Sequence, residues 1–119
     1  MRPQSAKAKG RRLQQQVRDL ILDLYPELTK DDVRSTGMGQ QGEDIQLSPK
    51  ARQLIPFQIE CKNKREVAVI NWLEKQAKEH GNHTPIVVAK QDFSDPVVVI
   101  DAVTFFKLLR ELNGSQGSI

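Results

Sequence analysis

Apolar positions recur along the chain with two different periods, and each period predicts one type of element. Helical spacing extends over about residues 10–25 and again over 68–80, which predicts two amphipathic helices, the first closed by Pro26. A last helix is expected to begin after Asp101, a favourable N-cap residue, and to end at Gly114. The pattern therefore places helices at the start, middle and end of the chain.

Other segments have the alternating or continuously apolar pattern of β-strands. A Gly-rich polar stretch, 35–42, separates the first two and predicts a turn. After the second strand, Ser48 and Pro49 are a favourable N-cap and first helical residue, which predicts one short helical turn. The predicted strands cover 32–35, 43–48, 54–62, 85–90 and 97–100.

The order of these elements indicates a fold class. It is helix, two or three strands, helix, two strands, helix, written α-β-β-(β)-α-β-β-α, which predicts a mixed sheet flanked by helices, of α/β or α+β class. A chain of 119 residues is long enough for one hydrophobic core. We therefore expect a single domain over 1–119, with a basic N-terminal arm at 1–9 and a flexible tail at 114–119.

Composition excludes several classes of protein. The chain is 38% hydrophobic and 28% charged, as in a soluble globular protein, and no apolar run approaches the roughly 20 residues that span a bilayer. No apolar segment follows the basic N-terminus, as it would in a secretory signal. A single cysteine can neither staple the fold nor by itself build a zinc site. We therefore expect a cytoplasmic protein with no membrane partner.

Positive charge is concentrated in clusters, although the net charge is only +3. The first dozen residues hold five cations, and no acidic residue precedes Asp19. Clustered cations favour a polyanionic partner, because neutralising phosphates releases counterions. A solvated tail is the alternative for the N-terminal cluster. The residues expected to contact phosphates are Lys7, Lys9, Arg11, Arg12, Arg34, Ser35, Lys64 and Arg65.

The stretch IECKNK places Glu60 and Lys62 on the same side of a predicted strand, with Cys61 facing the core. If this strand pairs antiparallel with the one before it, Asp44 converges with Glu60. Two carboxylates and the backbone carbonyl of Cys61 would make an oxygen site that suits Mg²⁺ or Mn²⁺. Lys62 could then position or deprotonate the nucleophile, or hold an oxygen of the pentavalent phosphate. The alternative is a surface ion pair between Glu60 and Lys62 that has no function.

This arrangement, with its core in GED (42–44) and ECK (60–62), resembles the PD-(D/E)XK or restriction-endonuclease-like nuclease superfamily. It is most similar to small phage-encoded and archaeal-type Holliday junction resolvase-like members. The resemblance implies a restriction-endonuclease-like core, Asp44 and Glu60 as metal ligands, and Lys62 as the catalytic lysine. A Gln that the family often adds on the next helix is matched by Gln76.

The first helix departs from the resolvase pattern. There the family has an acidic residue that helps to hold a metal, whereas this chain has Gln14 and Gln15, which we retain with Glu43 as accessory candidates. The departure puts a second metal in doubt. It also keeps open the alternative of a non-catalytic DNA-binding module that retains the nuclease fold.

The resemblance implies a metal-dependent DNA endonuclease that hydrolyses phosphodiester bonds. Mg²⁺ is the expected cofactor, with Mn²⁺ able to substitute, and the expected substrate is DNA, with a preference for branched or four-way-junction forms. Symmetric junction cleavage implies a homodimer, for which the adjacent Phe105 and Phe106 and the apolar run 97–100 offer surface. A phage-encoded member would act in the host cytoplasm. A plain structural or assembly protein with a basic arm is the weakest alternative.

Overall fold

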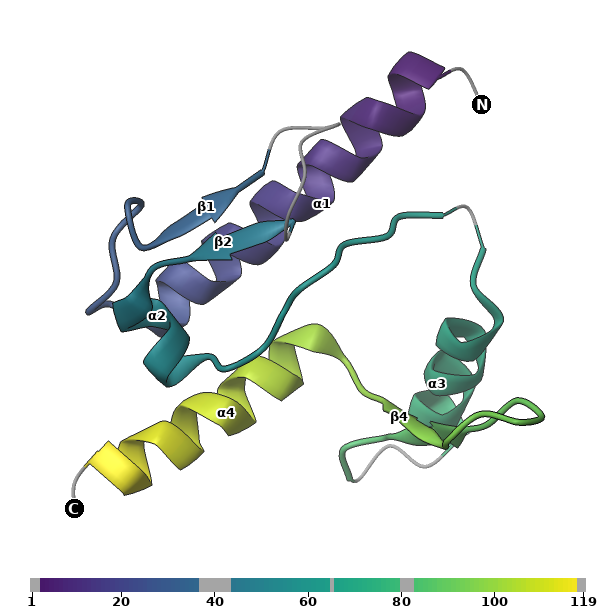
Figure 1. Cartoon of the computed structure of the whole chain (residues 1–119). Coiled ribbons are helices and arrows are strands. Elements are labelled where there is room, and N and C mark those ends of the chain that lie inside the picture. Colours follow the sequence, from purple (N-terminus) through teal and green to yellow (C-terminus); the bar gives the residue numbers. More distant parts are fainter. Residues whose placement is uncertain (1–2, 37–43, 65, 80–82, 118–119) are drawn as a thin grey trace. The chain divides into compact units, whose positions relative to one another are not determined.

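The computed structural model of the chain describes residues 3–36, 44–64, 66–79 and 83–117 and mixes α and β structure (Figure 1). In this part of the chain, four helices and four short strands follow the order α1-β1-β2-α2-α3-β3-β4-α4. They form two compact units. The first comprises Met1–Asn63 with Leu109–Ile119, and the second comprises Lys64–Leu108.

The first unit is built from α1 (Pro3–Leu24) packed against an antiparallel hairpin. The hairpin pairs β1 (Val33–Ser35) with β2 (Ile45–Leu47), so that Ser35 lies opposite Ile45. Each strand alternates a buried residue with an exposed one, the pattern of a sheet with one face on a core. The largest fully buried side chains of this unit are Tyr25, Ile21, Ile45, Ile55 and Val33.

A short helix, α2 (Pro49–Leu54), follows the hairpin and confirms the predicted helical turn. Ser48 is its N-cap, with the side-chain oxygen accepting the N–H of Ala51 at 3.1 Å. Proline has no backbone N–H, but at the first helical position this costs no hydrogen bond, because an N–H there would have no intrahelical partner. The Ser48 hydroxyl also donates to Asp32 Oδ1 at 2.7 Å, which connects the helix start to the residue before β1.

Asp32 accepts hydrogen bonds with both carboxylate oxygens. Its Oδ2 accepts the backbone N–H of Thr29 at 2.9 Å, and Oδ1 accepts the Ser48 hydroxyl. The bond from the Thr29 backbone, followed by that from Ser48, lowers the pKa of Asp32 below its ordinary value of 3.8. The charged carboxylate therefore braces the turn between α1 and β1.

We expect Asp32→Asn to reduce the acid sensitivity of the protein. Because the folded-state pKa is lowered, the stabilisation by Asp32 is fully present above the ordinary pKa of 3.8 and is lost as pH falls through the folded value. Urea unfolding between about pH 6 and about pH 2 should show wild type losing its advantage over the variant below about pH 4. A constant difference across that range would show that the charge of Asp32 does not stabilise the fold.

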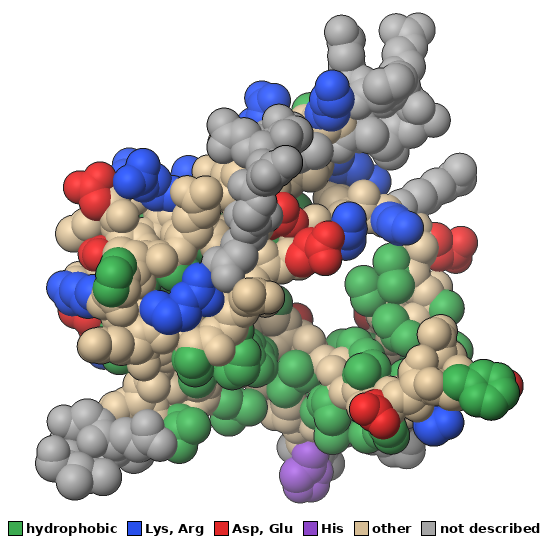
Figure 2. Space-filling view, viewed as in Figure 1, with side chains coloured by type: hydrophobic (Ala, Val, Ile, Leu, Met, Phe, Trp, Pro, Cys, Tyr) green, Lys and Arg blue, Asp and Glu red, His purple; other side chains and the backbone are tan. Residues whose placement is uncertain are grey.

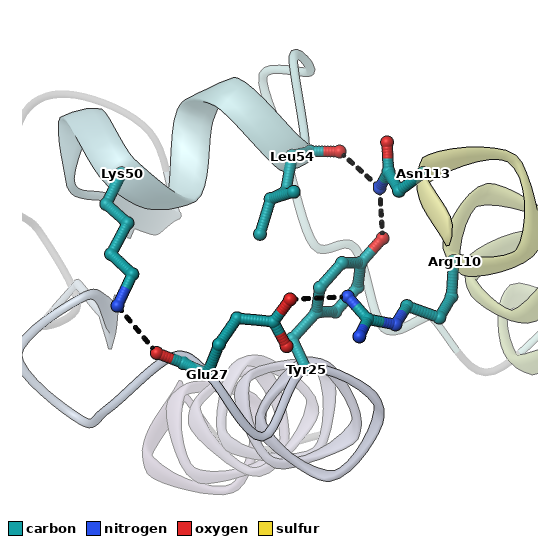
Figure 3. Close-up of polar contacts among 6 residues, drawn as sticks. All are labelled: Tyr25, Glu27, Lys50, Leu54, Arg110 and Asn113. Carbon is teal, nitrogen blue, oxygen red and sulfur yellow. Dashed lines mark hydrogen bonds and ion pairs between the residues drawn. The ribbon is translucent and has the colours of Figure 1, made fainter. Parts of the chain in front are cut away.

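The end of α4 (Ala102–Gly117) from Leu109 onward belongs to the first unit, where it makes polar contacts around Tyr25 (Figure 3). Asn113 Nδ2 donates to the Tyr25 hydroxyl oxygen at 2.8 Å and to the carbonyl of Leu54 at 2.8 Å. Arg110 forms an ion pair with Glu27 at 2.6 Å, and its guanidinium carbon lies 4.9 Å from the centre of the Tyr25 ring. The hydrogen bond from Arg110 lowers the pKa of Glu27, whereas burial raises the pKa of Tyr25.

The second unit contains α3 (Ala68–Glu79) and the antiparallel hairpin of β3 (Val87–Ala89) and β4 (Val97–Val99). The hairpin turn carries Phe93, which has a φ of 67° and a fully exposed side chain. Hydrophobic side chains gather on the visible surface around α3 and β4 (Figure 2). The large exposed ones in this unit are Ile70, Trp72, Ile86, Val88, Phe93, Val97, Val98, Val103 and Leu108.

The predicted strand over 54–62 is wrong. Residues 55–64 form neither helix nor strand, and β2 pairs with β1 instead of with this segment. Pro56 cannot donate to a sheet ladder, and the guanidinium of Arg52 bonds the carbonyl of Phe57 instead of leaving it for a strand neighbour. The mixed sheet is also absent among the described residues, which form two separate antiparallel pairs. The restriction-endonuclease-like core therefore stays a prediction.

The terminal helices are longer than predicted. α1 begins at Pro3, so most of the predicted basic arm is helical, and proline is favourable at the first position of a helix. Thr104 N–H donates to Asp101 Oδ2 at 3.0 Å, which confirms the N-cap of α4, but that helix continues through Gly114. Glycine in a helix costs only about 1 kcal/mol relative to alanine. No helix in the described ranges is long and apolar enough to cross a membrane.

Candidate functional site

Asp44 joins two segments that are far apart in the sequence. It lies directly before β2, where its carbonyl accepts the N–H of Thr36 at 2.8 Å and extends the hairpin ladder by one residue. Its side-chain Oδ2 accepts the backbone N–H of Cys61 at 2.6 Å. Asp44 is therefore brought beside the ECK triplet by a side-chain bond, whereas the sequence predicted that strand pairing would do so.

Glu60 and Lys62 form an ion pair on the surface of the first unit. Lys62 Nζ lies 3.1 Å from Glu60 Oε1, and both side chains are 70% exposed. Exposed pairs of this kind contribute between about 0 and 1 kcal/mol to stability. Both groups are thus reachable from solvent, and the fold depends little on either of them.

Cys61 is half-buried, whereas the sequence predicts that it faces the core. Burial raises the pKa of its thiol, and the negative charges of Asp44 and Glu60 raise it further. The thiol is therefore neutral near pH 7 and is a poor nucleophile.

These oxygen donors fit a hard divalent cation better than zinc. Mg²⁺ keeps several waters and takes one or two carboxylates together with substrate phosphate oxygens. Asp44 and Glu60 supply two carboxylates, and the bond to Cys61 uses one of about four lone-pair sites on Asp44. Within the described ranges, no group of three or more His, Cys, Asp and Glu side chains is arranged to hold a metal by itself.

No family model matches the chain, and neither a curated protein nor a solved structure matches it.

Gln14 is buried on α1, the helix that packs against the hairpin. Its side chain is 4% exposed, and among the described residues its Oε1 has no hydrogen-bond partner. An unsatisfied buried acceptor costs about 1–3 kcal/mol, so a donor or a cation at this oxygen would be favourable. Gln14 remains an accessory candidate on that basis, and Gln15 is its half-buried neighbour.

The remaining candidates are distributed over both units. Gln76 is exposed on α3 in the second unit, so its catalytic role stays a prediction. Lys64 is also exposed, whereas Glu43 and Arg65 lie outside the described residues. The N-terminal cations, Lys7, Lys9, Arg11 and Arg12, are all on α1.

Two basic residues that line a pocket are absent from the candidates predicted by the sequence. Arg18 and Lys30 line a pocket together with Arg34 and Ser35 of β1. Helical periodicity could have identified Arg18, because Lys7, Arg11 and Arg18 recur at intervals of four and seven residues and share one face of α1. Lys30 follows the helix in a turn and belongs to no periodic pattern.

Proposed function

We propose that the chain is a metal-dependent DNA endonuclease of the PD-(D/E)XK type, with its site at Asp44, Glu60 and Lys62. The observation that carries the proposal is the 2.6 Å hydrogen bond from Cys61 N–H to Asp44 Oδ2. It brings the acidic residue after the Gly-rich segment against the acidic-x-Lys triplet. A surface ion pair with no function does not require this third group.

Each residue has a distinct task in this proposal. Asp44 and Glu60 would hold Mg²⁺, with the carbonyl of Cys61 as a further oxygen ligand, and Mn²⁺ could substitute. The metal would lower the pKa of a bound water and neutralise charge on the phosphodiester. The ammonium of Lys62, held 3.1 Å from Glu60, can donate to a phosphate oxygen as negative charge develops there.

The direct test is cleavage of plasmid DNA by the purified protein with Mg²⁺, with Mn²⁺ and with a chelator. Cleavage that requires the metal is the expected result. DNA binding without cleavage under all three conditions would support the alternative, a non-catalytic DNA-binding module. The neutral Gln14, at a place where the resolvase family has an acidic residue, permits that alternative. Neither binding nor cleavage would contradict both.

We further propose a homodimer that prefers branched DNA. Val97 and Val98 support the homodimer, because they are 58% and 60% exposed on β4, a strand that pairs only with β3 among the described residues. Phe106 does not contribute, because it is buried, and Phe105 is half-buried against it with ring centres 5.2 Å apart.

Val98→Lys is expected to convert the dimer to a monomer and to reduce cleavage of a four-way junction more than cleavage of linear duplex. Like charges facing each other across a two-fold interface repel. Sedimentation at micromolar protein, with junction and duplex cleavage assayed in parallel, measures both effects. A wild-type monomer that cuts both substrates equally would be consistent with a nuclease but would contradict the dimer and its preference for branched DNA.

A further inference from the structure

A pocket of about 260 Å³ lies on the first unit and is lined by Arg18, Lys30, Val33, Arg34 and Ser35. Its volume is below the roughly 300–1,000 Å³ of pockets that enclose drug-sized ligands. The pocket therefore suits one small group better than a whole nucleotide. Three of its five lining residues are cationic, which favours an anion.

The pocket follows the open edge of β1. It is lined by three consecutive strand residues, Val33, Arg34 and Ser35. Successive side chains of a strand point to opposite faces, so a pocket at the strand edge accounts for contact with all three. In an antiparallel pair, residues that hydrogen-bond to the partner strand alternate with residues that do not. Asp32 and Thr36 bond to Ser48 and Asp44, so the N–H of Ser35 points away from β2 toward this edge.

The cations of the pocket keep donors available for a ligand. Arg18 pairs with Asp19 at 2.9 Å, using Nε and one terminal nitrogen, but a guanidinium has five N–H donors. Lys30 and Arg34 are exposed. With the hydroxyl and the backbone N–H of Ser35, this set resembles the combination of charge and backbone donors that binds phosphate oxygens.

The turn that carries Lys30 is held in place before any ligand binds. The N–H groups of Asp32 and Val33 donate to the carbonyl of Thr29 at 2.9 and 3.3 Å, and the carboxylate of Asp32 accepts from the N–H of Thr29. A fixed turn reduces the ordering entropy that Lys30 would otherwise lose on binding.

We propose that this pocket binds a phosphate group and, resting on the proposed nuclease function, that the group is a backbone phosphate of the DNA substrate. The hairpin register places Ser35 opposite Ile45, the residue after Asp44. β1 lies one strand spacing, about 4.8 Å, from β2, the strand that follows the candidate metal ligand, so a phosphate at the outer edge of β1 would lie farther from β2 than that spacing. Phosphate contacts of this kind fix the register of the DNA without reading its sequence.

The test compares the double variant Lys30→Gln/Arg34→Gln with the matched control Lys78→Gln/Lys107→Gln. All four side chains are exposed, and each variant removes two positive charges. Nuclear magnetic resonance follows backbone amides during titration with inorganic phosphate, and fluorescence anisotropy measures binding of a short DNA duplex without Mg²⁺ at several salt concentrations. Circular dichroism verifies that both variants are folded.

Phosphate is expected to shift the amide resonances of Lys30 and Ser35 in wild type and in the control, but not in the pocket variant. Loss of charge-assisted bonds should weaken duplex binding by at least about tenfold in the pocket variant relative to the control. The slope of log affinity against log salt should fall by about 0.9 for each phosphate that the pocket variant no longer neutralises.

Phosphate shifts combined with equal duplex affinity in both variants would overturn the DNA assignment and identify a site for free phosphate. The absence of shifts, together with equal affinity, would overturn the proposal entirely. If the pocket variant alone loses duplex binding but the wild-type protein never cleaves DNA, the result would support binding of DNA phosphate in the pocket. It would contradict only the proposed nuclease activity.

Discussion

Glu60→Gln is expected to reduce metal-dependent DNA cleavage by at least about a hundredfold. Glutamine keeps the size of the side chain but removes the charge that would hold the metal. Because the Glu60 side chain is 70% exposed and pairs with the equally exposed Lys62, the free energy of unfolding should change by less than about 0.5 kcal/mol. Plasmid cleavage rates and urea unfolding measure the two effects separately.

Asp44 and Lys62 should give different companion results. Asp44→Asn should lose activity because it removes the charge, but it should remain stable because the amide oxygen still accepts the N–H of Cys61. Asp44→Ala should lose activity and also lower the free energy of unfolding by about 1 kcal/mol. Lys62→Ala should lose activity but still bind Mn²⁺, which calorimetry can measure. Lys75→Ala is a matched control for Lys62→Ala, since Lys75 forms an exposed ion pair with Glu79 at 3.9 Å on α3.

Full cleavage by the Glu60→Gln protein would remove this residue from the site and leave the pair as a structural contact. Equal losses in the Lys75→Ala control and in Lys62→Ala would show that any change of surface charge impairs DNA binding. In that case the loss in Lys62→Ala would say nothing about catalysis.

Tyr25→Ala is expected to lower the free energy of unfolding by about 3–5 kcal/mol. The side chain is fully buried, so its removal leaves a cavity beneath the end of α4. It also removes the acceptor of Asn113 and the ring under the guanidinium of Arg110. Total stabilities of small domains are only about 5–15 kcal/mol, so this variant should be close to unfolding.

Tyr25→Phe separates the hydroxyl from the ring. It retains the packing and loses only the bond from Asn113, so a cost of about 1 kcal/mol is expected. Urea unfolding of both variants followed by circular dichroism makes the comparison. Similar losses for the two variants would show that the hydroxyl dominates, and small losses for both would contradict the packing of α4 on this unit.

The positions of the strands and the cap of α2 could be predicted because their causes are local, whereas the sequence did not predict which strands pair. Ser48 before Pro49 favours a helix start, and apolar alternation or short apolar runs beside turn residues indicate β1, β2, β3 and β4. The segment 54–62 has the same alternation but forms no strand. A strand requires a partner edge, and sequence alternation does not reveal that β2 pairs with β1 instead.

The sequence predicts that Asp44 lies near the triplet, but not the interaction that brings them together. Asp44 and the triplet were expected to converge through paired strands, but a single side-chain bond joins them. A bond between a carboxylate and a backbone N–H 17 residues away has no periodic trace in the sequence. The same applies to Lys30, whose position depends on the hydrogen bonds of Asp32.

The contacts of Asn113 with Tyr25 and Leu54 determine when the first unit can be completed during synthesis. This unit is discontinuous in sequence, with 64–108 between its two parts. Chains emerge from the ribosome at about 5–20 residues per second, so α1 and the first hairpin are exposed for several seconds before the end of α4 is made. During that interval the ring of Tyr25 lacks the contacts of Asn113 and Arg110, and the nascent chain offers this apolar surface to chaperones or to other nascent chains.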